Sequence, residues 1–181
     1  MLTDNAIMLK VKEGDLDRMG LLFERYHRQL YGFLFHMTYK KELAEDMVQH
    51  TFYKMLKYRN SFTGTGEFVH WMYTVARNVL KDEYKKMKRA QLHDDVDNIS
   101  DILPGGVHTG DMYDKKEAAR GLHKAMEKLS DEQREILTMS RFQELKHQEI
   151  AEILNMTEGA VKVRVHRAMQ ELKSIYTKME S

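Results

Sequence analysis

Apolar residues recur along most of the chain every three or four positions, which is the spacing of one face of an α-helix. The clearest stripe lies near the carboxyl end, within about 40° on a helical wheel, and consists of Val161, Val165, Ala168 and Leu172. No window alternates with the period of two that a half-buried strand requires. The pattern therefore predicts an all-α protein.

The opposite side of that carboxyl-terminal helix has a different character. It carries Val163, His166, Arg167 and Gln170, flanked by Gly159, Ala160 and Lys162. Side chains that can donate to base edges, mixed with small residues that permit close approach, are typical of a helix in a DNA major groove. A short apolar segment, Ile150 to Leu154, precedes it across a tight turn, so the two predict a helix-turn-helix. The alternative, an ordinary amphipathic surface helix, would not explain the short helix that precedes it.

A second amphipathic helix is predicted over residues 43–55. Ala44, Val48, Thr51 and Met55 form its apolar side. Asp46, Gln49 and Tyr53 lie roughly 180° away on the wheel and should be exposed. Taken alone, an exposed acid and amide one turn apart are most simply a solvated surface, and a binding surface is the alternative.

Helix boundaries can also be predicted near both ends of the chain. Thr3 or Asp4 can cap a short helix that ends near Gly14, and Asp15 can cap a second one. The apolar repeat of this second helix is Met19, Leu22, Phe23, Tyr26 and Leu30. Ser130 and Gln133 have the spacing of a capping box at the start of a further helix.

The net charge is only +1, but the charge is unevenly distributed. The segment from Arg77 to Arg89 contains six Lys or Arg and only two acidic residues, and this excess of positive charge suits contacts with DNA phosphates. Between Asp94 and Asp114 there are six Asp and no Lys or Arg. Residues 93–114 also contain the only proline, followed by two glycines, and too few apolar residues to order the segment alone. We predict a flexible acidic linker there, between domains at 1–92 and 115–181.

Two motifs in the chain resemble the same protein family. Glu149-Ile150-Ala151, the turn from Leu154 to Thr157, and Gly159-x-Val161-Lys162-x-Arg164-x-His166-Arg167-Ala168 resemble region four of the extracytoplasmic-function (ECF) sigma factors, the small initiation factors of bacterial RNA polymerase. Response-regulator effector domains carry a similar helix-turn-helix, so this match alone does not distinguish them from sigma factors. Residues 43–52 independently resemble sigma region two. Together the two matches identify the chain as a member of the ECF sigma factors.

The resemblance assigns expected roles to particular residues. Asp46, Gln49 and Tyr53 would contact core RNA polymerase. Residues 62–78 resemble the promoter-opening segment, in which a loop takes up a flipped base; by position, Phe62, Val75 and Asn78 would line the pocket. In that segment we expect Trp71 to lie in the core, and Phe62 and Asn78 to contact DNA. The expected contacts with the DNA backbone are Arg77, Lys81, Lys85 and Arg164, and those with the upstream promoter element are Lys162, Val163, His166 and Arg167.

The expected protein is therefore a sigma factor with no catalytic activity, cofactor or metal of its own. It would consist of region two (1–92), which binds polymerase and melts the promoter, and region four (115–181), which binds the upstream promoter element. An anti-sigma factor is an expected partner by resemblance alone. Two alternatives are a dimeric helix-turn-helix repressor or response-regulator effector, which would have no use for Asp46 and Gln49, and a metal-dependent nuclease.

Several chemical classes are disfavoured by what the sequence lacks. There is no cysteine, which excludes disulfides and thiolate zinc sites. No two of the nine histidines stand three or four positions apart, so paired helical metal ligands are missing. The closest group is Glu42, Asp46 and His50, but the resemblance explains Asp46 better as a polymerase contact. No segment approaches 18 consecutive apolar residues and no signal pattern opens the chain, so we expect a cytoplasmic protein with no membrane insertion.

Four positions depart from the usual pattern of region four. Ser130 stands where proline is usual, a change for which the capping box can compensate. Glu144 stands where glycine is usual, and Lys146 where a Ser or Thr cap is usual. Lysine cannot accept hydrogen bonds from free backbone amides, and its charge opposes the positive end of the helix dipole. Asn155 replaces a common glycine, a mild change because asparagine tolerates the left-handed conformation.

Overall fold

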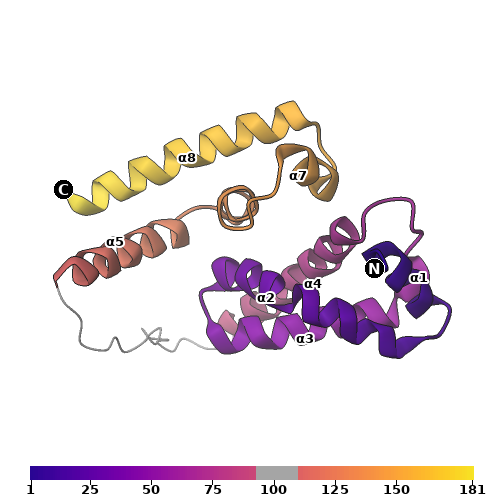
Figure 1. Ribbon diagram of the computed structural model, residues 1–181. Coiled ribbons are helices and arrows are strands. Elements are labelled where there is room, and N and C mark those ends of the chain that lie inside the picture. Colours follow the sequence, from indigo (N-terminus) through magenta and orange to yellow (C-terminus); the bar gives the residue numbers. More distant parts are fainter. Residues whose placement is uncertain (93–109) are drawn as a thin grey trace.

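The computed structural model describes residues 1–92 and 110–181, with side chains from residue 114 onward in the second range. Every regular element in these ranges is helical, which confirms the predicted all-α class for this part of the chain. The helices form two groups that lie against each other (Figure 1). None of the described helices is long and apolar enough to span a bilayer.

The first group contains four α-helices and two short 3₁₀ turns. They are α1 (Asp4–Lys12), η1 (Leu16–Arg18), α2 (Met19–Thr38), α3 (Lys41–Lys57), η2 (Arg59–Ser61) and α4 (Phe68–Gln91). As predicted, Thr3 caps α1, since its hydroxyl oxygen accepts from the amide of Ala6 at 3.2 Å. Asp15 does not cap the second helix as expected. It precedes η1, and its carboxylate instead pairs with Arg18 at 3.0 Å, so α2 begins only at Met19.

The core of this group lies where α2 packs on α3 and α3 on α4. Met19, Leu22 and Leu30 are buried on α2 as predicted. Phe23 was also expected to be buried, but it is 39% exposed, and its ring meets that of Phe52 edge-on. The periodicity placed it on the edge of the apolar stripe, where tertiary packing decides burial.

The second group contains four α-helices and one π-helical turn. They are α5 (Gly110–Glu127), α6 (Asp131–Leu137), η3 (Thr138–Phe142), α7 (His147–Leu154) and α8 (Glu158–Glu180). The π turn was not predicted; it continues directly from α6 and closes with the amide of Gln143 donating to the carbonyl of Thr138 at 2.9 Å. The predicted capping box is present, since Ser130 and Gln133 each accept the other's backbone amide through their side chains.

The carboxyl end of the expected linker at 93–114 overlaps the first residues of a helix. Helix α5 already begins at Gly110, so residues 110–114 are helical. The run of helix-favouring residues that follows, Lys115 to Arg120, explains this, because extending an existing helix costs far less than starting one. Residues 93–109, with most of the acidic stretch, lie outside the described residues.

Candidate functional site

The predicted polymerase-binding side of α3 is exposed. Asp46, Gln49 and Tyr53 all lie on the surface, and the Tyr53 side chain is 58% exposed. The opposite side is buried, as predicted, through Ala44, Val48, Thr51 and Met55. The buried hydroxyl of Thr51 is satisfied locally, because it donates to the carbonyl of Met47 at 2.7 Å. The helix thus has the two-sided character that the sequence indicated.

The loop at residues 62–67 joins η2 to α4 and forms the first part of the predicted promoter-opening segment, residues 62–78. Phe62 is only 2% exposed, and its ring packs 5.2 Å from that of Trp71 and 6.3 Å from that of Phe68. The expectation that Phe62 faces DNA is therefore corrected, because this aromatic cluster draws the ring into the core. Trp71 is half-buried against the core, as favoured above, while Val75 is half-buried and Asn78 is exposed.

The basic part of α4 is only partly available to DNA. Lys81 and Lys85 are exposed. Arg77 is engaged instead with the second helix group, where its Nε lies 2.6 Å and its Nη2 3.3 Å from the carboxylate oxygens of Glu135 on α6. Its remaining nitrogen, Nη1, lies 3.5 Å from the carbonyl of Ile153 on α7. The structure therefore gives Arg77 a protein partner where the sequence predicted a phosphate.

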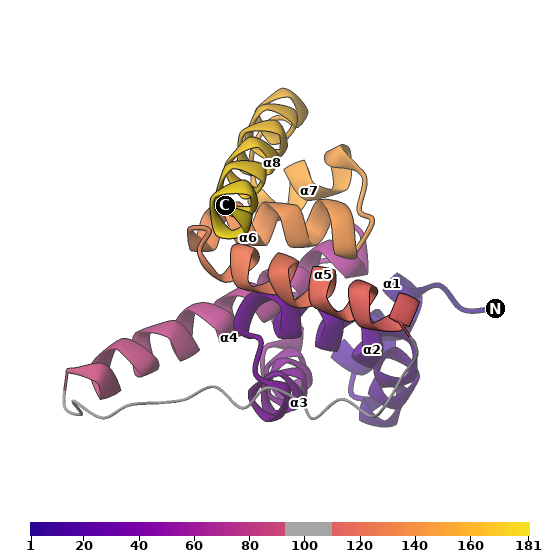
Figure 2. The ribbon, with the colours of Figure 1, turned by 90° about the vertical axis from the view of Figure 1, so that its left-hand side faces the viewer.

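Further polar contacts join the two helix groups, and Figure 2 shows α6 and α7 facing the first group. His70 of α4 lies 2.6 Å from the carboxylate of Glu152 on α7. The Tyr73 hydroxyl lies 2.9 Å from the side chain of Gln143, and burial raises the pKa of this tyrosine to about 12. Arg134 donates to the carbonyl of Met37 at 3.1 Å. The sequence showed no sign of these contacts, which join residues 70 to 97 positions apart.

Aromatic stacking completes the contact at the end of α2. The His36 ring stacks on Phe142 of η3 with centroids 3.8 Å apart, and Tyr39 stacks on His123 of α5 at 3.5 Å. Burial lowers the pKa of His36, with a further contribution from His123. The Nδ1 atom of His36 is buried without a hydrogen-bond partner.

The helix-turn-helix consists of α7 and α8. The stripe of α8 is buried as predicted, and its other side is open to solvent. The exposed residues on that side include Lys162, Val163, His166, Arg167 and Gln170, and Arg164 is exposed on the flank of the helix. Val163 is 49% exposed, so it offers an apolar contact amid basic groups. We call Lys162, Val163, His166 and Arg167 the recognition face.

The two ends of α7 show how the atypical residues are accommodated. Asn155 takes the left-handed conformation after α7, as predicted, at a φ of 53°. Glu144 also has a φ of 53°, a conformation that glycine adopts with less strain. At Lys146 only half of a capping box forms: Glu149 accepts the Lys146 amide at 2.7 Å, but the lysine side chain accepts nothing in return.

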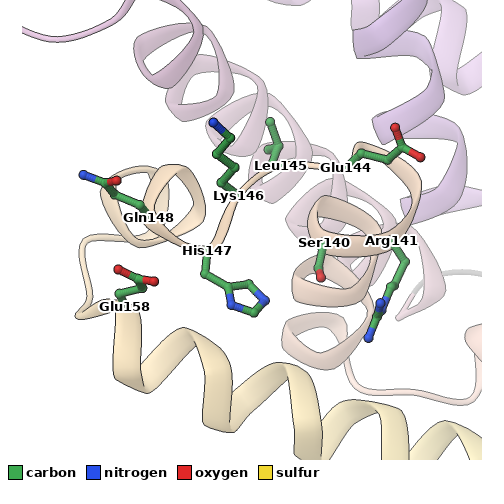
Figure 3. Close-up of a pocket in the computed structure, with 8 residues that line it drawn as sticks. All are labelled: Ser140, Arg141, Glu144, Leu145, Lys146, His147, Gln148 and Glu158. Carbon is green, nitrogen blue, oxygen red and sulfur yellow. The ribbon is translucent and has the colours of Figure 1, made fainter.

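A shallow hollow of about 510 Å³ lies beside the amino ends of α7 and α8 (Figure 3). In Figure 3 the imidazole of His147 points into it, toward the turn that carries Ser140. Arg141 and Lys146 are balanced by Glu144 and Glu158 around it. This mixed lining does not indicate an anion-binding site, and no three His, Asp or Glu among the described residues are arranged to hold a metal.

Comparisons with known proteins bear on both helix groups. The family model for sigma-70 region 2 matches residues 22–90, and that for sigma-70 region 4 matches residues 119–172. The RNA polymerase sigma factor YlaC of Bacillus subtilis is 31% identical over 169 residues, which cover 90% of this chain and 94% of that protein. The ECF RNA polymerase sigma factor SigM of the same organism is 32% identical over 159 residues, covering 87% and 94%.

Two solved structures share the arrangement of the helices. The sigma factor RpoE in complex with the anti-sigma factor NepR from Bartonella quintana has a TM-score of 0.69 at 25% identity, over 87% of this chain and 96% of that one. CnrH in complex with the cytosolic domain of CnrY has a TM-score of 0.72 at 20% identity, over 97% of both chains, which supports the fold alone.

Proposed function

Because the chain belongs to the ECF group of the sigma-70 family, and so directs RNA polymerase to promoters, we propose how its surfaces divide that work. The observation that carries the proposal is that α3 and α8 each have one buried and one exposed side, and that each exposed side carries the residues expected to bind. Polymerase binds α3, and the upstream promoter element binds α8. The domain boundaries proposed for this division are 1–92, 93–114 and 115–181.

Core polymerase contacts Asp46, Gln49 and Tyr53 on α3. These side chains project from a helix whose other side is anchored in the core, so they form a rigid surface that binds without paying for helix formation. The exposed tyrosine supplies apolar area, and tyrosine is enriched among the residues that contribute most to binding at protein interfaces.

Promoter melting belongs to the loop at 62–67 and the start of α4. Asn78 is exposed and Val75 partly so, and both suit a base pocket on the surface of α4. Phe62 and Trp71 support this pocket from beneath through their aromatic cluster. Lys81 and Lys85, further along α4, contact the DNA backbone. Arg77 also contacts it once its ion pair with Glu135 is broken.

Upstream recognition belongs to the recognition face of α8. Arg167 and Lys162 can donate to guanine, whereas Val163 suits a thymine methyl group. His166 lies on the same exposed side, and Arg164 lies on the flank of the helix, where it contacts phosphate.

Three further properties follow from this assignment. The protein acts without catalysis of its own, because the polymerase performs the chemistry. Its place of action is the cytoplasm, where bacterial polymerase and promoters meet. An anti-sigma factor regulates it, a proposal supported by the likeness to RpoE, which was solved with the anti-sigma factor NepR.

One experiment tests the proposal against the other two classes of protein. Purified protein is added to sigma-free bacterial core polymerase on fragments of genomic DNA, and the start sites of the transcripts are mapped. We expect initiation at specific sites that disappears when the protein is omitted. A repressor would bind DNA without producing transcripts, and a nuclease would cut the template.

A further inference from the structure

Helix α1 presents two separate faces to the rest of its helix group. Ile7, Met8 and Val11 point into the core and are fully buried. Asn5, Leu9 and Lys12 are spaced by four and then three residues, which places them together on another face of the helix. This second face meets the loop at 62–67 that precedes α4, and Figure 1 shows α1 beside the start of α4.

Asn5 binds the carboxyl end of the loop at two points. Its Nδ2 donates to the carbonyl of Gly66 at 2.8 Å, and its Oδ1 accepts from the amide of Phe68 at 2.7 Å. Phe68 is the first residue of α4, and Glu67 before it makes no capping hydrogen bond with its side chain. Asn5 therefore satisfies a free amide at the start of α4 from 63 residues away, a task usually performed by the residue just before a helix.

Lys12 and Leu9 hold the other parts of the loop. The Nζ of Lys12 donates to the carbonyl of Phe62 at 2.7 Å, where the loop begins. In the middle, Gly64 has a φ of +74°, and a Cβ at that position would lie 3.3 Å from a methyl group of Leu9. The loop is thus held at its start, middle and end by one face of one helix.

We propose that α1 positions the promoter-opening loop, with Asn5 and Lys12 as positioning residues for the capture of an unpaired DNA base. This inference rests on the melting role proposed for the loop. A loop that is already ordered captures its ligand with less loss of conformational entropy, so more of the binding energy remains to hold the unstacked base. Asn5 and Lys12 act through the loop backbone and need not touch DNA themselves.

The test uses full-length protein assembled with core polymerase. The template is a duplex promoter selected by the wild-type holoenzyme from a random-sequence library. Open complex is measured as permanganate reactivity of unpaired thymines. Each of Asn5→Ala and Lys12→Met removes donors to a loop carbonyl, and each should reduce opening by about threefold to tenfold, the range that corresponds to one hydrogen bond. Lys12→Arg keeps a cationic donor and should restore most of the opening.

Two comparisons separate positioning from a general loss of structure. Lys10→Met changes an exposed lysine on another side of α1 and should open the promoter like wild type. On a template with a preformed bubble of mismatches, the Asn5→Ala and Lys12→Met proteins should approach wild-type activity, because the unstacking step has been removed. Equal defects on duplex and bubble templates, or none on either, would overturn the role of α1. Failure of the wild-type protein to open any duplex would instead overturn the melting role of the loop.

Discussion

The guanidinium of Arg77 on α4 forms a two-point ion pair with the carboxylate of Glu135 on α6, with its shortest distance at 2.6 Å. Both side chains are largely withdrawn from solvent, at 19% and 14% exposure. The pair occupies the edge of the guanidinium that would otherwise bind a phosphate, since both ligands use the same paired donors. The Glu135 carboxylate and a DNA phosphate therefore compete for the same edge of Arg77.

Breaking this pair should favour the DNA-binding state of the free protein. In Glu135→Ala, Arg77 loses its partner and becomes available to phosphate. The affinity of the free protein for duplex DNA should rise by a factor on the order of five, because charged hydrogen bonds are stronger than neutral ones and this one is partly screened. Fluorescence anisotropy at fixed salt measures the affinity, and small-angle scattering should show a larger radius of gyration.

A matched control removes the same charge elsewhere. Glu132 also lies on α6 but is exposed, and no ion pair with it is seen among the described side chains. Glu132→Ala changes the net charge equally. An equal gain in DNA affinity in both variants would show that charge alone is responsible and that the Arg77 pair has no special role.

The contact between the helix groups should weaken in mild acid. The pKa of His36 is lowered by burial against Phe142, with His123 adding to the effect. The pKa of His123 is also lowered by burial, although nearby Glu127 partly opposes this. Because the packed state favours neutral rings, their contribution is fully present above pH 6.5 and is lost as the pH falls below it.

Thermal melts between pH 7.5 and 5.5 check this dependence. Wild-type protein should lose stability as the pH falls. His36→Phe keeps a ring against Phe142 but cannot be protonated, so its melting temperature should change less over the same range. Both proteins retain the contact between His70 and Glu152. Identical pH profiles would show that His36 does not report on the contact.

Polymerase binding should depend on Asp46 and Gln49 without any effect on folding. Both are exposed on α3, so replacing both with Ala should change stability by no more than about 0.5 kcal/mol each. Affinity for core polymerase should fall sharply, as measured by competition with a labelled wild-type protein. Glu24→Ala, an exposed change on α2, serves as the control. Unaltered affinity in the double variant would remove α3 from the polymerase interface.

Helix α7 should gain stability from a better cap. Lys146→Ser supplies the hydroxyl that the present half of the capping box lacks, and it should stabilise the protein by roughly 0.5 to 2 kcal/mol. Lys146→Ala separates this effect from removal of the charge, since it relieves the dipole but accepts no hydrogen bond. Denaturant unfolding of the three proteins measures the difference. If the serine variant is no more stable than the alanine variant, the lysine has a role other than starting the helix.

Two arginines on α8 should affect DNA binding in different ways. Arg167→Ala should cost about 1 to 3 kcal/mol and relax the preference at one base pair, because Arg167 lies on the recognition face. Arg164→Ala should weaken binding to all sequences alike and lower the salt slope by about one unit. Binding-site selection and salt titration distinguish the two. If Arg167→Ala keeps the wild-type sequence preference, base recognition belongs to another side chain.

The sequence by itself determined the features that depend on residues close together in the chain. The buried stripes of α3 and α8, the capping box at Ser130 and the left-handed Asn155 were all predicted correctly. Each follows from helical periodicity or from hydrogen bonds within one turn, and these act whatever the rest of the protein does. The exposure of Asp46 and Arg167 follows in the same way.

Only the tertiary structure decided which side chains are free to act. It buried Phe62, gave Arg77 a partner 58 residues away and placed Asn5 at the start of α4, 63 residues away. No local pattern contains these relationships, because an arginine in a basic helix has the same spacing whether it faces an acid or a phosphate. The choice depends on which helices pack together, and the free energy of that packing is shared over the whole core.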